Sequence, residues 1–569
     1  MTTRRHFLRQ MVQVSGVLVA PSLLAACAQQ GPAAKPTEAP AAKPTDAAKP
    51  AAPAAAPAAT TAPAAPAAAA KPTEAAKPAE AAKPAAPAAS TSGAKFVYVW
   101  GSSEFPVRMN PQYTTAVPTT QMYDNFYDTL TRRTPDLQLV PGLATEWKLI
   151  NDTTWQFKLR PNVKWHNGDP FTAADVKFTV ERTKDPEAKT IHATVFKTVK
   201  SIEVVDDLTI NFLMAAPDGL LPGRFAHYGG YLMPAKYFAA VGADEFEKKP
   251  VGTGPFKFVE FIKDDHLTLD ANTEYWGGAP NVDGLLIRPL PEAASRIAAL
   301  QKGDVHFIDR VPDDQMAALE AGANTQTFSV PFAGVSFVVL NAKSGPLTQK
   351  ALRQAMNFGI DRESLSKDLF LGRWKLATGP VPAGEIGAKP GATPPPFDVK
   401  KARDLVAQSG YKGDEIAFEV LPGDKALAEA LTAMWKDIGV NAKLQIIEPS
   451  VRSQKIANGS FTGAFTAGFV STLADPSGLM WRSLGPGGVL SAYWSNDEWE
   501  KLGNEADSIL DQDKRKANYE RMVDIMMEEI PWLVLFHPAQ NFAALKSVTW
   551  KPHPNYMLDL RKENLTVKR

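Results

Sequence analysis

The sequence predicts an α/β protein in which strands and helices alternate along one large globular region. Short runs rich in β-branched and aromatic residues indicate strands: residues 95–100 read KFVYVW, and residues 154–159 alternate polar and apolar side chains as TWQFKL. Other stretches carry apolar residues at helical spacing, and residues 347–357 are the clearest of these. The region has no internal repeat and no heptad pattern, so neither a solenoid nor a coiled coil is expected.

The elements can be placed in order from their end signals. Thr172 followed by Asp175 marks a helix start, and a later helix begins on a capping Asp424 and stops before Gly439. The strands are expected at residues 95–100, 154–159, 440–447 and 532–536, and the helices from residue 172 and over 347–357, 424–438 and 513–530.

The first 27 residues indicate an export signal. Arg4 and Arg5 precede a moderately apolar run, residues 11–24, that is too short and too polar to span a bilayer permanently. Paired arginines before such a run are typical of twin-arginine export signals. The run ends in Leu-Ala-Ala-Cys27, which resembles the lipobox of bacterial lipoproteins and implies that Cys27 is acylated. An ordinary signal peptide with an unmodified cysteine is the alternative.

Residues 28–93 consist almost entirely of Ala, Pro and Lys with scattered polar residues. They contain almost nothing to bury, so the entropy of ordering them cannot be offset and we expect a disordered tether. The prolines favour an extended chain. Such a tether would hold the globular region at a distance from a membrane, and a wall-binding or partner-recruiting segment is the alternative.

The globular region, residues 94–569, is long enough for two or three domains. The chain has 62 Lys or Arg and 61 Asp or Glu; because nine of the former and four of the latter precede residue 94, the globular region has a net charge near −4. That charge gives no indication of a nucleic-acid partner or of binding to an acidic membrane surface. No second apolar run approaches transmembrane length.

None of the common catalytic or metal-binding motifs is found in the sequence. Residues 334–338 read GVSFV and lack the last glycine of a nucleophile elbow, and no cysteine follows Cys27 to act as a nucleophile. The seven histidines after residue 93 lie singly. In residues 252–255, GTGP, the proline removes a backbone donor that a phosphate would need, which favours a structural turn. We therefore predict no catalytic residue, no metal and no cofactor.

A series of stretches carries a family resemblance. They are NP at residues 110–111, YDTL at 127–130, LVPGLA at 139–144 with Trp147, FKLRPNVKWHNG at 157–168, FTAADV at 171–176, GTGPF at 252–256, NTEYW at 272–276, LT at 347–348, RQAMN at 353–357 and IDR at 360–362. In this order they resemble the peptide/nickel/opine family (family 5) of solute-binding lipoproteins of ABC importers, including its dipeptide- and oligopeptide-binding members. Each stretch alone is weak evidence for the family, but the series covers nearly all of residues 94–569.

The resemblance implies a two-lobed periplasmic-binding-protein fold of type II, in the large cluster C form, with an extra subdomain in lobe I and a two-segment hinge. Lobe I is expected over residues 94–337 and again over 538–569, and lobe II over 338–537. The protein is expected to be extracytoplasmic, lipid-anchored and monomeric, with an ABC permease as its partner. The WHNG stretch at 165–168 is expected to build a turn in lobe I and not to contact ligand.

The resemblance also implies a ligand-binding segment at residues 467–477, which read AGFVSTLADPS. In the peptide-binding members an aromatic residue, here Phe469, is followed by an aspartate that binds the peptide ammonium; that position holds Thr472, and Asp475 matches a turn acid. A buried ammonium needs a counter-charge. Either another carboxylate, Asp475 or Glu104, therefore replaces the missing one, or the ligand has no free amine, as for the family's binders of oligosaccharides, opines and metal chelates.

Further ligand-binding candidates follow from the resemblance. Ser103, Glu104 and Phe105 come directly after the first predicted strand, where the family's first ligand-facing loop lies. The aromatic candidates suit sugar rings or apolar side chains, with a place in the core as the alternative for the three tryptophans; they are Trp374, Trp481, Tyr493 and Trp494.

Two functions of different classes stay open. The first is an importer's receptor that captures a peptide, a peptide-like compound or an oligosaccharide between two lobes. The second is an exported enzyme or chaperone on the same scaffold, for which the sequence offers no acid–base pair or nucleophile.

Overall fold

The computed structural model describes residues 95–105, 108–114, 117–382, 384–389, 391–471, 473, 475–554 and 557–568. The predicted export signal with Arg4 and Arg5, the predicted lipidation site Cys27, the tether and Thr472 lie outside the described residues. Within the described ranges, no helix has the length and apolar character needed to cross a bilayer.

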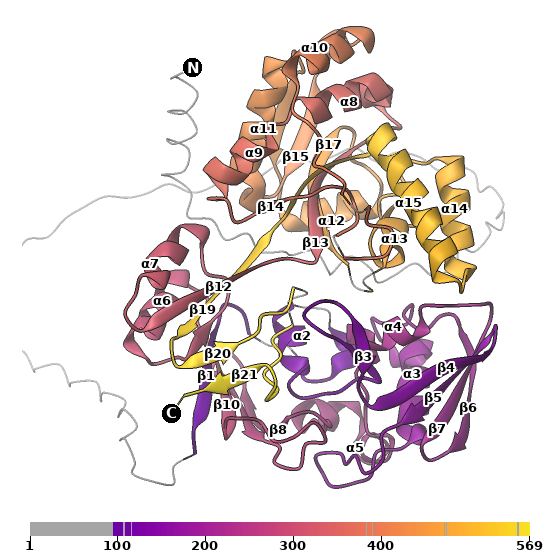
Figure 1. Ribbon diagram of the computed structural model, residues 1–569, viewed down its shortest axis with the longest axis vertical. Helices are drawn as coiled ribbons and strands as arrows, with labels where there is room; N and C mark the ends of the chain where they lie inside the picture. The colour runs from indigo at the N-terminus through magenta and orange to yellow at the C-terminus, as the bar shows by residue number, and fades with distance from the viewer. Residues whose placement is uncertain are drawn as a thin grey trace, which may run out of the picture. The chain divides into compact units, whose positions relative to one another are not determined.

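The strands of the described chain form three sheets and two short ribbons (Figure 1). The seven-stranded sheet has the order β12-β19-β11-β1-β10-β9-β8, the six-stranded sheet β14-β18-β13-β17-β15-β16, and the four-stranded sheet β4-β5-β7-β6. The first contains β1 (Val97–Ser102), β8 (Phe256–Ile262), β9 (His266–Ala271), β10 (Gly284–Pro289), β11 (Phe307–Ile308), β12 (Thr325–Pro331) and β19 (Ala539–Leu545). The second contains β13 (Gly334–Leu340), β14 (Lys375–Leu376), β15 (Ile416–Val420), β16 (Ala442–Ile446), β17 (Ala464–Val470) and β18 (Trp532–His537). The third contains β4 (Ala144–Asn151), β5 (Thr154–Leu159), β6 (Val199–Asp206) and β7 (Thr209–Met214), and the ribbons pair β2 (Thr131–Arg133) with β3 (Leu139–Pro141) and β20 (Val548–Trp550) with β21 (Leu565–Val567).

The helices pack around these sheets. Those of the N-terminal half are α2 (Val117–Tyr123), α3 (Ala173–Lys184), α4 (Leu221–Phe225), α5 (Ala235–Lys248), α6 (Ala293–Lys302) and α7 (Met316–Glu320). Those that follow are α8 (Lys350–Phe358), α9 (Arg362–Ser364), α10 (Val399–Gln408), α11 (Lys425–Asp437), α12 (Pro449–Ala457), α13 (Met480–Leu484), α14 (Asp497–Ser508) and α15 (Gln512–Glu529).

Several predicted elements are confirmed by the structure. Strand β5 spans residues 154–159 as expected, β1 covers most of the first predicted strand, and β18 is buried along its length up to His537. Thr172 and Asp175 form a capping box at the start of α3, because each side chain pairs with the other residue's backbone N–H. The WHNG stretch is a turn, closed by the Gly168 N–H donating to the Trp165 carbonyl at 2.8 Å, with Gly168 at a φ of 91°.

Two details of the helix predictions are wrong. Asp424 does not cap α11, because a 3₁₀ turn, Pro422–Asp424, leads into the helix and leaves Asp424 with a φ of −93° and a ψ of 0°. Its carboxylate accepts a hydrogen bond from the Thr466 hydroxyl at 2.5 Å instead. The helix expected over 347–357 is divided into a 3₁₀ turn, Gly345–Thr348, and α8, with Gln349 as the N-cap between them.

The six-stranded sheet is covered by helices on both faces (Figure 1). Successive residues of β13 point to opposite faces: Val338 and Leu340 pack with α8 and α11, whereas Phe337 and Val339 pack with α14 and α15. Both faces of β13 are therefore buried, which explains its nearly continuous apolar sequence.

The chain passes between the seven-stranded and the six-stranded sheet at two adjacent places. It leaves β12 for β13 through residues 332–333, and it returns from β18 to β19 through Pro538. The two connections are joined by a hydrogen bond, in which the Phe332 N–H donates to the Pro538 carbonyl at 2.8 Å.

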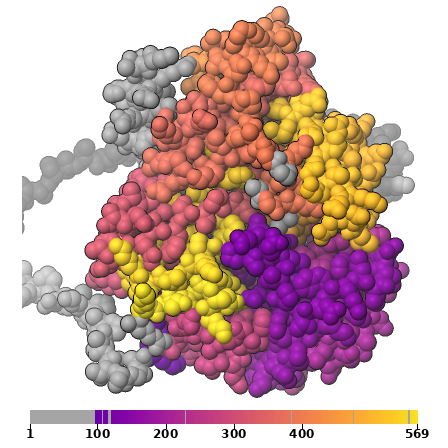
Figure 2. All heavy atoms as spheres, in the orientation of Figure 1, coloured from indigo at the N-terminus to yellow at the C-terminus, as the bar shows by residue number. Residues whose placement is uncertain are grey.

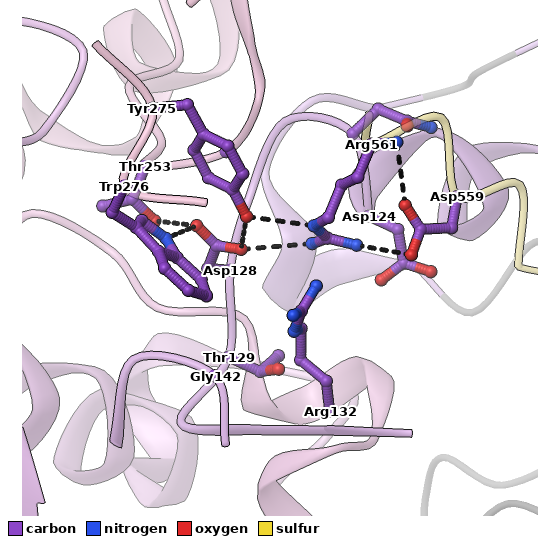
Figure 3. Close-up of polar contacts among 12 residues, drawn as sticks. Asp124, Asp128, Thr129, Arg132, Gly142, Thr253, Tyr275, Trp276, Asp559 and Arg561 are labelled. Carbon is purple, nitrogen blue, oxygen red and sulfur yellow. Dashed lines mark hydrogen bonds and ion pairs between the residues drawn. The ribbon is translucent and has the colours of Figure 1, made fainter. Parts of the chain in front are cut away.

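Three stretches of the resemblance series converge on the carboxylate of Asp128, which is 1% exposed (Figure 3). It accepts hydrogen bonds from the Thr253 hydroxyl at 3.1 Å, the Tyr275 hydroxyl at 3.0 Å and the Trp276 indole N–H at 2.8 Å. The fourth donor is the guanidinium of Arg561, at 3.1 Å. A buried carboxylate needs donors such as these to replace the water that it has lost, so Asp128 anchors distant segments to one another.

Arg561 attaches the C-terminal segment to this cluster. It also pairs with Asp559 at 2.9 Å, and the Asn125 amide donates to the Leu558 carbonyl at 2.5 Å. In Figure 2 the yellow C-terminal segment lies against the indigo and purple N-terminal part of the described chain. Nearby Asp124 accepts a hydrogen bond from the Tyr231 hydroxyl at 2.8 Å. Burial raises the pKa of Asp124 to about 7, although the charge of Arg561 opposes that rise.

Replacing Asp128 with Asn is expected to lower the free energy of unfolding by about 3–5 kcal/mol, because Arg561 loses its buried counter-charge and the amide cannot accept all four bonds. Urea unfolding monitored by circular dichroism measures this loss. Asp304→Asn, at the exposed pair with Lys302, is the control and should change stability by less than about 1 kcal/mol. Equal losses of stability in Asp128→Asn and Asp304→Asn would contradict the role of Asp128 as a buried anchor.

Asp124 predicts a pH dependence of stability. Its pKa is raised from 3.8 in the unfolded chain to about 7 in the folded one, so the folded state retains a proton that the unfolded state releases. The resulting stabilisation of the folded state is complete below pH 4. It is lost as pH rises to about 7, which lowers the free energy of unfolding by on the order of 4 kcal/mol. The stability of wild type relative to Asp124→Asn should therefore fall between pH 4 and pH 7 in urea unfolding, and a constant difference would refute this.

Candidate ligand-binding site

The segment predicted to bind ligand leaves the six-stranded sheet at the end of β17. This strand pairs antiparallel with β13 up to Val470, and the chain then turns into a short 3₁₀ helix, Pro476–Gly478. Asp475 caps that helix, because its carboxylate accepts the Ser477 N–H at 2.9 Å. The apolar strand residues thus hold one end of the segment and a capped turn holds the other.

Asp475 is also one half of a buried ion pair. Its second oxygen lies 2.8 Å from the guanidinium of Arg515 on α15, and the two side chains are 7% and 5% exposed. A Cβ placed on Gly219 would lie 3.4 Å from Arg515, so the segment before α4 approaches the same pair closely. Asp475 therefore already has a cationic partner supplied by the protein.

A second arginine connects this segment to the β2–β3 ribbon. Arg133 donates from one guanidinium nitrogen to the Leu473 carbonyl and from another to the Leu137 carbonyl, the latter at 2.8 Å. Burial lowers the pKa of Arg133, while the charges of Glu385 and Asp475 raise it. Arg133, which belongs to the N-terminal part of the chain, thus places a positive charge beside the loop after β17.

Ser103, Glu104 and Phe105 follow β1 as predicted, and each is engaged within the protein. Ser103 donates its backbone N–H and its hydroxyl to the two carboxylate oxygens of Asp309, at 2.7 and 2.9 Å. Glu104 pairs with Arg310, and the ring of Phe105 stacks on Phe261 with centroids 5.4 Å apart.

The aromatic candidates lie in or beside the cores of the six-stranded sheet. Trp374 stacks on Phe370 with centroids 3.8 Å apart; the Trp481 indole donates to Asp507 at 2.9 Å; the Tyr493 hydroxyl donates to the Lys455 carbonyl at 3.1 Å; and Trp494 packs edge-on against Trp499. All four are buried, whereas Phe469 is half-buried against Phe337. The roles of these rings in ligand binding stay predictions.

Two charged residues at this site were missed by sequence analysis. Arg133 lies in a TRRT stretch and Glu385 in an irregular AGEIGA stretch, and neither sequence carries a motif. Only the fold brings both to the segment that holds Asp475.

A small cavity borders Arg133 on the side of the buried ion cluster. About 20 Å³ of it is accessible to the centre of a water molecule, which is room for about one water. Its lining includes Asp124, Arg132, Arg133, His227 and Arg561. Among the residues that the structure describes, no group of three or more His, Cys, Asp or Glu side chains is arranged to hold a metal ion.

Comparison with known sequences identifies the family. A profile of the bacterial extracellular solute-binding proteins, family 5 (middle region), matches residues 138–491. The chain is 27% identical over 484 residues to the oligopeptide-binding protein AppA of Bacillus subtilis, covering 80% of this chain and 89% of that protein. It is 24% identical over 489 residues to the dipeptide-binding protein of Escherichia coli, covering 79% and 90%. Heme-binding protein A of Haemophilus influenzae is 26% identical over 497 residues, covering 80% and 89%.

Solved structures show the same fold. The ABC transporter substrate-binding protein CtaP of Listeria monocytogenes matches with a TM-score of 0.76 and 22% identity, covering 83% of this chain and 99% of that chain. The AppA protein of Bacillus subtilis in complex with a nonapeptide matches with a TM-score of 0.68 and 26% identity, with the same coverage.

The fold, with its separate α/β sheets and doubly crossed connection, is that of the periplasmic binding proteins. Since the family profile also covers more than half of its length, the chain belongs to the bacterial extracellular solute-binding proteins of family 5. The predicted family and fold class are confirmed.

The ion pair of Asp475 predicts a structural effect of its removal. Asp475→Asn keeps a cap for the Ser477 N–H but leaves Arg515 buried without its counter-charge, which is expected to lower the free energy of unfolding by about 3–5 kcal/mol. Urea unfolding measures the loss. Glu498→Gln, at an exposed pair with Arg521 on the same helix α15, should cost less than about 1 kcal/mol. If Asp475→Asn were as stable as wild type, the ion pair would not be structural, and Asp475 would again be a candidate for binding a ligand cation.

Proposed function

We propose that the protein is the extracytoplasmic receptor of an ABC importer, which encloses a small ligand between two lobes and delivers it to a membrane permease. The observation that carries the proposal is the double crossing between the seven-stranded and six-stranded sheets at residues 332–333 and 538. Two adjacent connections allow two rigid bodies to rotate against each other while most of the core stays packed.

The lobes in this proposal follow the two sheets. Lobe I takes the seven-stranded sheet with the four-stranded sheet as its extra subdomain, and lobe II takes the six-stranded sheet. The boundaries at residues 332–333 and 538 are close to those expected from the sequence, after residues 337 and 537. Arg133 and Leu473 then form a contact between the lobes, at the segment expected to bind ligand.

Ligand binding would shift an equilibrium between open and closed forms, because a ligand contacts both lobes only when they are closed. The relatives described above are named for binding oligopeptides, dipeptides and heme. We infer a small ligand of the peptide or peptide-like class for this chain, with an oligosaccharide as the alternative. We infer no enzymatic role; an exported enzyme or chaperone on this scaffold would turn its ligand over.

The N-terminal part completes the proposal. Export by the twin-arginine route through Arg4 and Arg5, acylation of Cys27 and a tether over residues 28–93 would hold a monomeric receptor at the membrane surface. A tether of this composition would let the lobes reach the permease from its anchor.

Native mass spectrometry of the full chain, purified gently with Cys27→Ser to avoid acylation, tests the proposal. A receptor that closes around its ligand is expected to retain small molecules from the expression host, seen as adducts that dissociate on collisional activation. Each recovered compound should raise the melting temperature when added back, and it should be recovered chemically unchanged. An adduct-free chain that no compound of a peptide and oligosaccharide panel stabilises would contradict the receptor function, and product formation would favour the enzyme.

A further inference from the structure

The acids that the sequence offered as replacements for the missing aspartate are both occupied. Asp475 pairs with Arg515, and Glu104 pairs with Arg310. A ligand cation could use either carboxylate only by competing with a guanidinium that the protein already supplies. The structure therefore directs the search to an acid whose carboxylate accepts no hydrogen bond.

Glu385 is such an acid. Its residue is 5% exposed, and both carboxylate oxygens are buried with no hydrogen-bond partner in the part of the chain that the structure describes. Burial raises the pKa of Glu385 to about 8, and the charge of Asp475 adds to that rise, while the charge of Arg133 opposes it. Buried polar atoms without partners are rare in folded proteins, so two on one carboxylate call for an explanation.

The surroundings of Glu385 are those of the candidate site. Residues 384–389 pack against the loop after β17 and against α15, because a Cβ on Gly387 would lie 3.4 Å from Pro476 and 2.6 Å from Tyr519. Further polar atoms near this loop are also buried without a hydrogen-bond partner among the described residues. They include the hydroxyl oxygens of Ser471, Ser477 and Tyr519 and the Nε atoms of Arg133 and Arg515.

We propose that Glu385 is the counter-charge for an ammonium group of the ligand, in a subsite that it shares with Ser471 and Arg133. This rests on the proposed function, because Glu385 is buried and a ligand would reach it only when the lobes separate. An ammonium group would supply hydrogen-bond donors to both unpartnered oxygens. The ligand class is then a compound with a free amine, such as a peptide, and not an uncharged oligosaccharide.

The assignment carries a pH signature. Glu385 holds its proton at neutral pH, so capture of a cation releases that proton, and affinity should rise as pH increases from 6 to 7. The titratable and charged groups facing Glu385 are Asp475 and Arg133, with Tyr519 on the packed helix α15. Burial raises the pKa of Tyr519 well above this range, and Asp475 is held in its ion pair with Arg515. Because the α-ammonium of a peptide itself titrates near pH 7.7–8.0, the comparison is made between pH 6 and 7, where the ligand keeps its charge. The part of the pH dependence in that range that Glu385→Gln abolishes reports on Glu385.

Two synthetic tripeptide mixtures serve as probes, one with free N-termini and one N-acetylated. Binding to the full chain is measured by isothermal titration calorimetry. The free-amine mixture should bind wild type, and Glu385→Gln should weaken it by on the order of tenfold to a hundredfold. The control Glu498→Gln, at the exposed acid paired with Arg521, should bind as wild type does, and the acetylated mixture should bind wild type no better than it binds Glu385→Gln.

Proton release is read from wild type alone, which keeps the test sharp if Glu385→Gln folds poorly. Titrations of wild type in phosphate and in Tris at one pH should give heats that differ because the two buffers have different ionisation enthalpies. As a further check, this difference should vanish in a Glu385→Gln variant that folds. Equal binding of free and acetylated peptides, full binding by Glu385→Gln, or buffer-independent heats would each overturn the inference. Binding of neither mixture would overturn it as well, and the receptor function would then be judged separately by the ligands retained from the host.

Discussion

The buried carboxylate of Asp128 is the constraint on which the first lobe depends. Four donors, from the segments around residues 253, 275 and 561, converge on an acid that is 1% exposed. Desolvating a carboxylate is unfavourable unless such donors replace its water, so the segments are held together as one arrangement. Arg561 matters most among them, because it brings back the end of the chain after the passage through the six-stranded sheet.

The same cluster positions the candidate site. Strand β2 begins three residues after Asp128, and the Thr129 hydroxyl donates to the Thr131 carbonyl at 2.6 Å, which orients the start of that strand. Arg132 faces the cavity beside the ion cluster, and the next residue, Arg133, reaches the Leu473 carbonyl. A short ribbon anchored at one end by a rigid buried cluster can thus present a charged side chain at its other end with little freedom. In the proposed receptor, a side chain held in this way would contact the other lobe in only one lobe arrangement.

Much of the fold could be predicted because its signals are local. β5 and α3 follow from alternation and from a capping box within their own residues. Asp424 shows the limit: it has the residue type of a cap, but a preceding 3₁₀ turn and the Thr466 hydroxyl, 42 positions away, decide its role. The series of short stretches succeeded for a physical reason, since YDTL, GTGPF and NTEYW are the segments that meet at Asp128.

The site was harder to predict because sequence shows residue types and not their partners. Asp475 and Glu385 are both buried acids near the loop after β17. Nothing in their flanking residues indicates that Asp475 is paired with Arg515, whereas the oxygens of Glu385 accept no hydrogen bond. Asp128 shows the physical difference between a buried acid that has hydrogen-bond donors and one that has none. A buried acid that the protein surrounds with donors contributes to the fold, whereas one that it leaves without donors is destabilising by itself, and a cationic ligand would remove that penalty. Such an acid can favour a closed lobe arrangement only when ligand is present, which couples binding to closure.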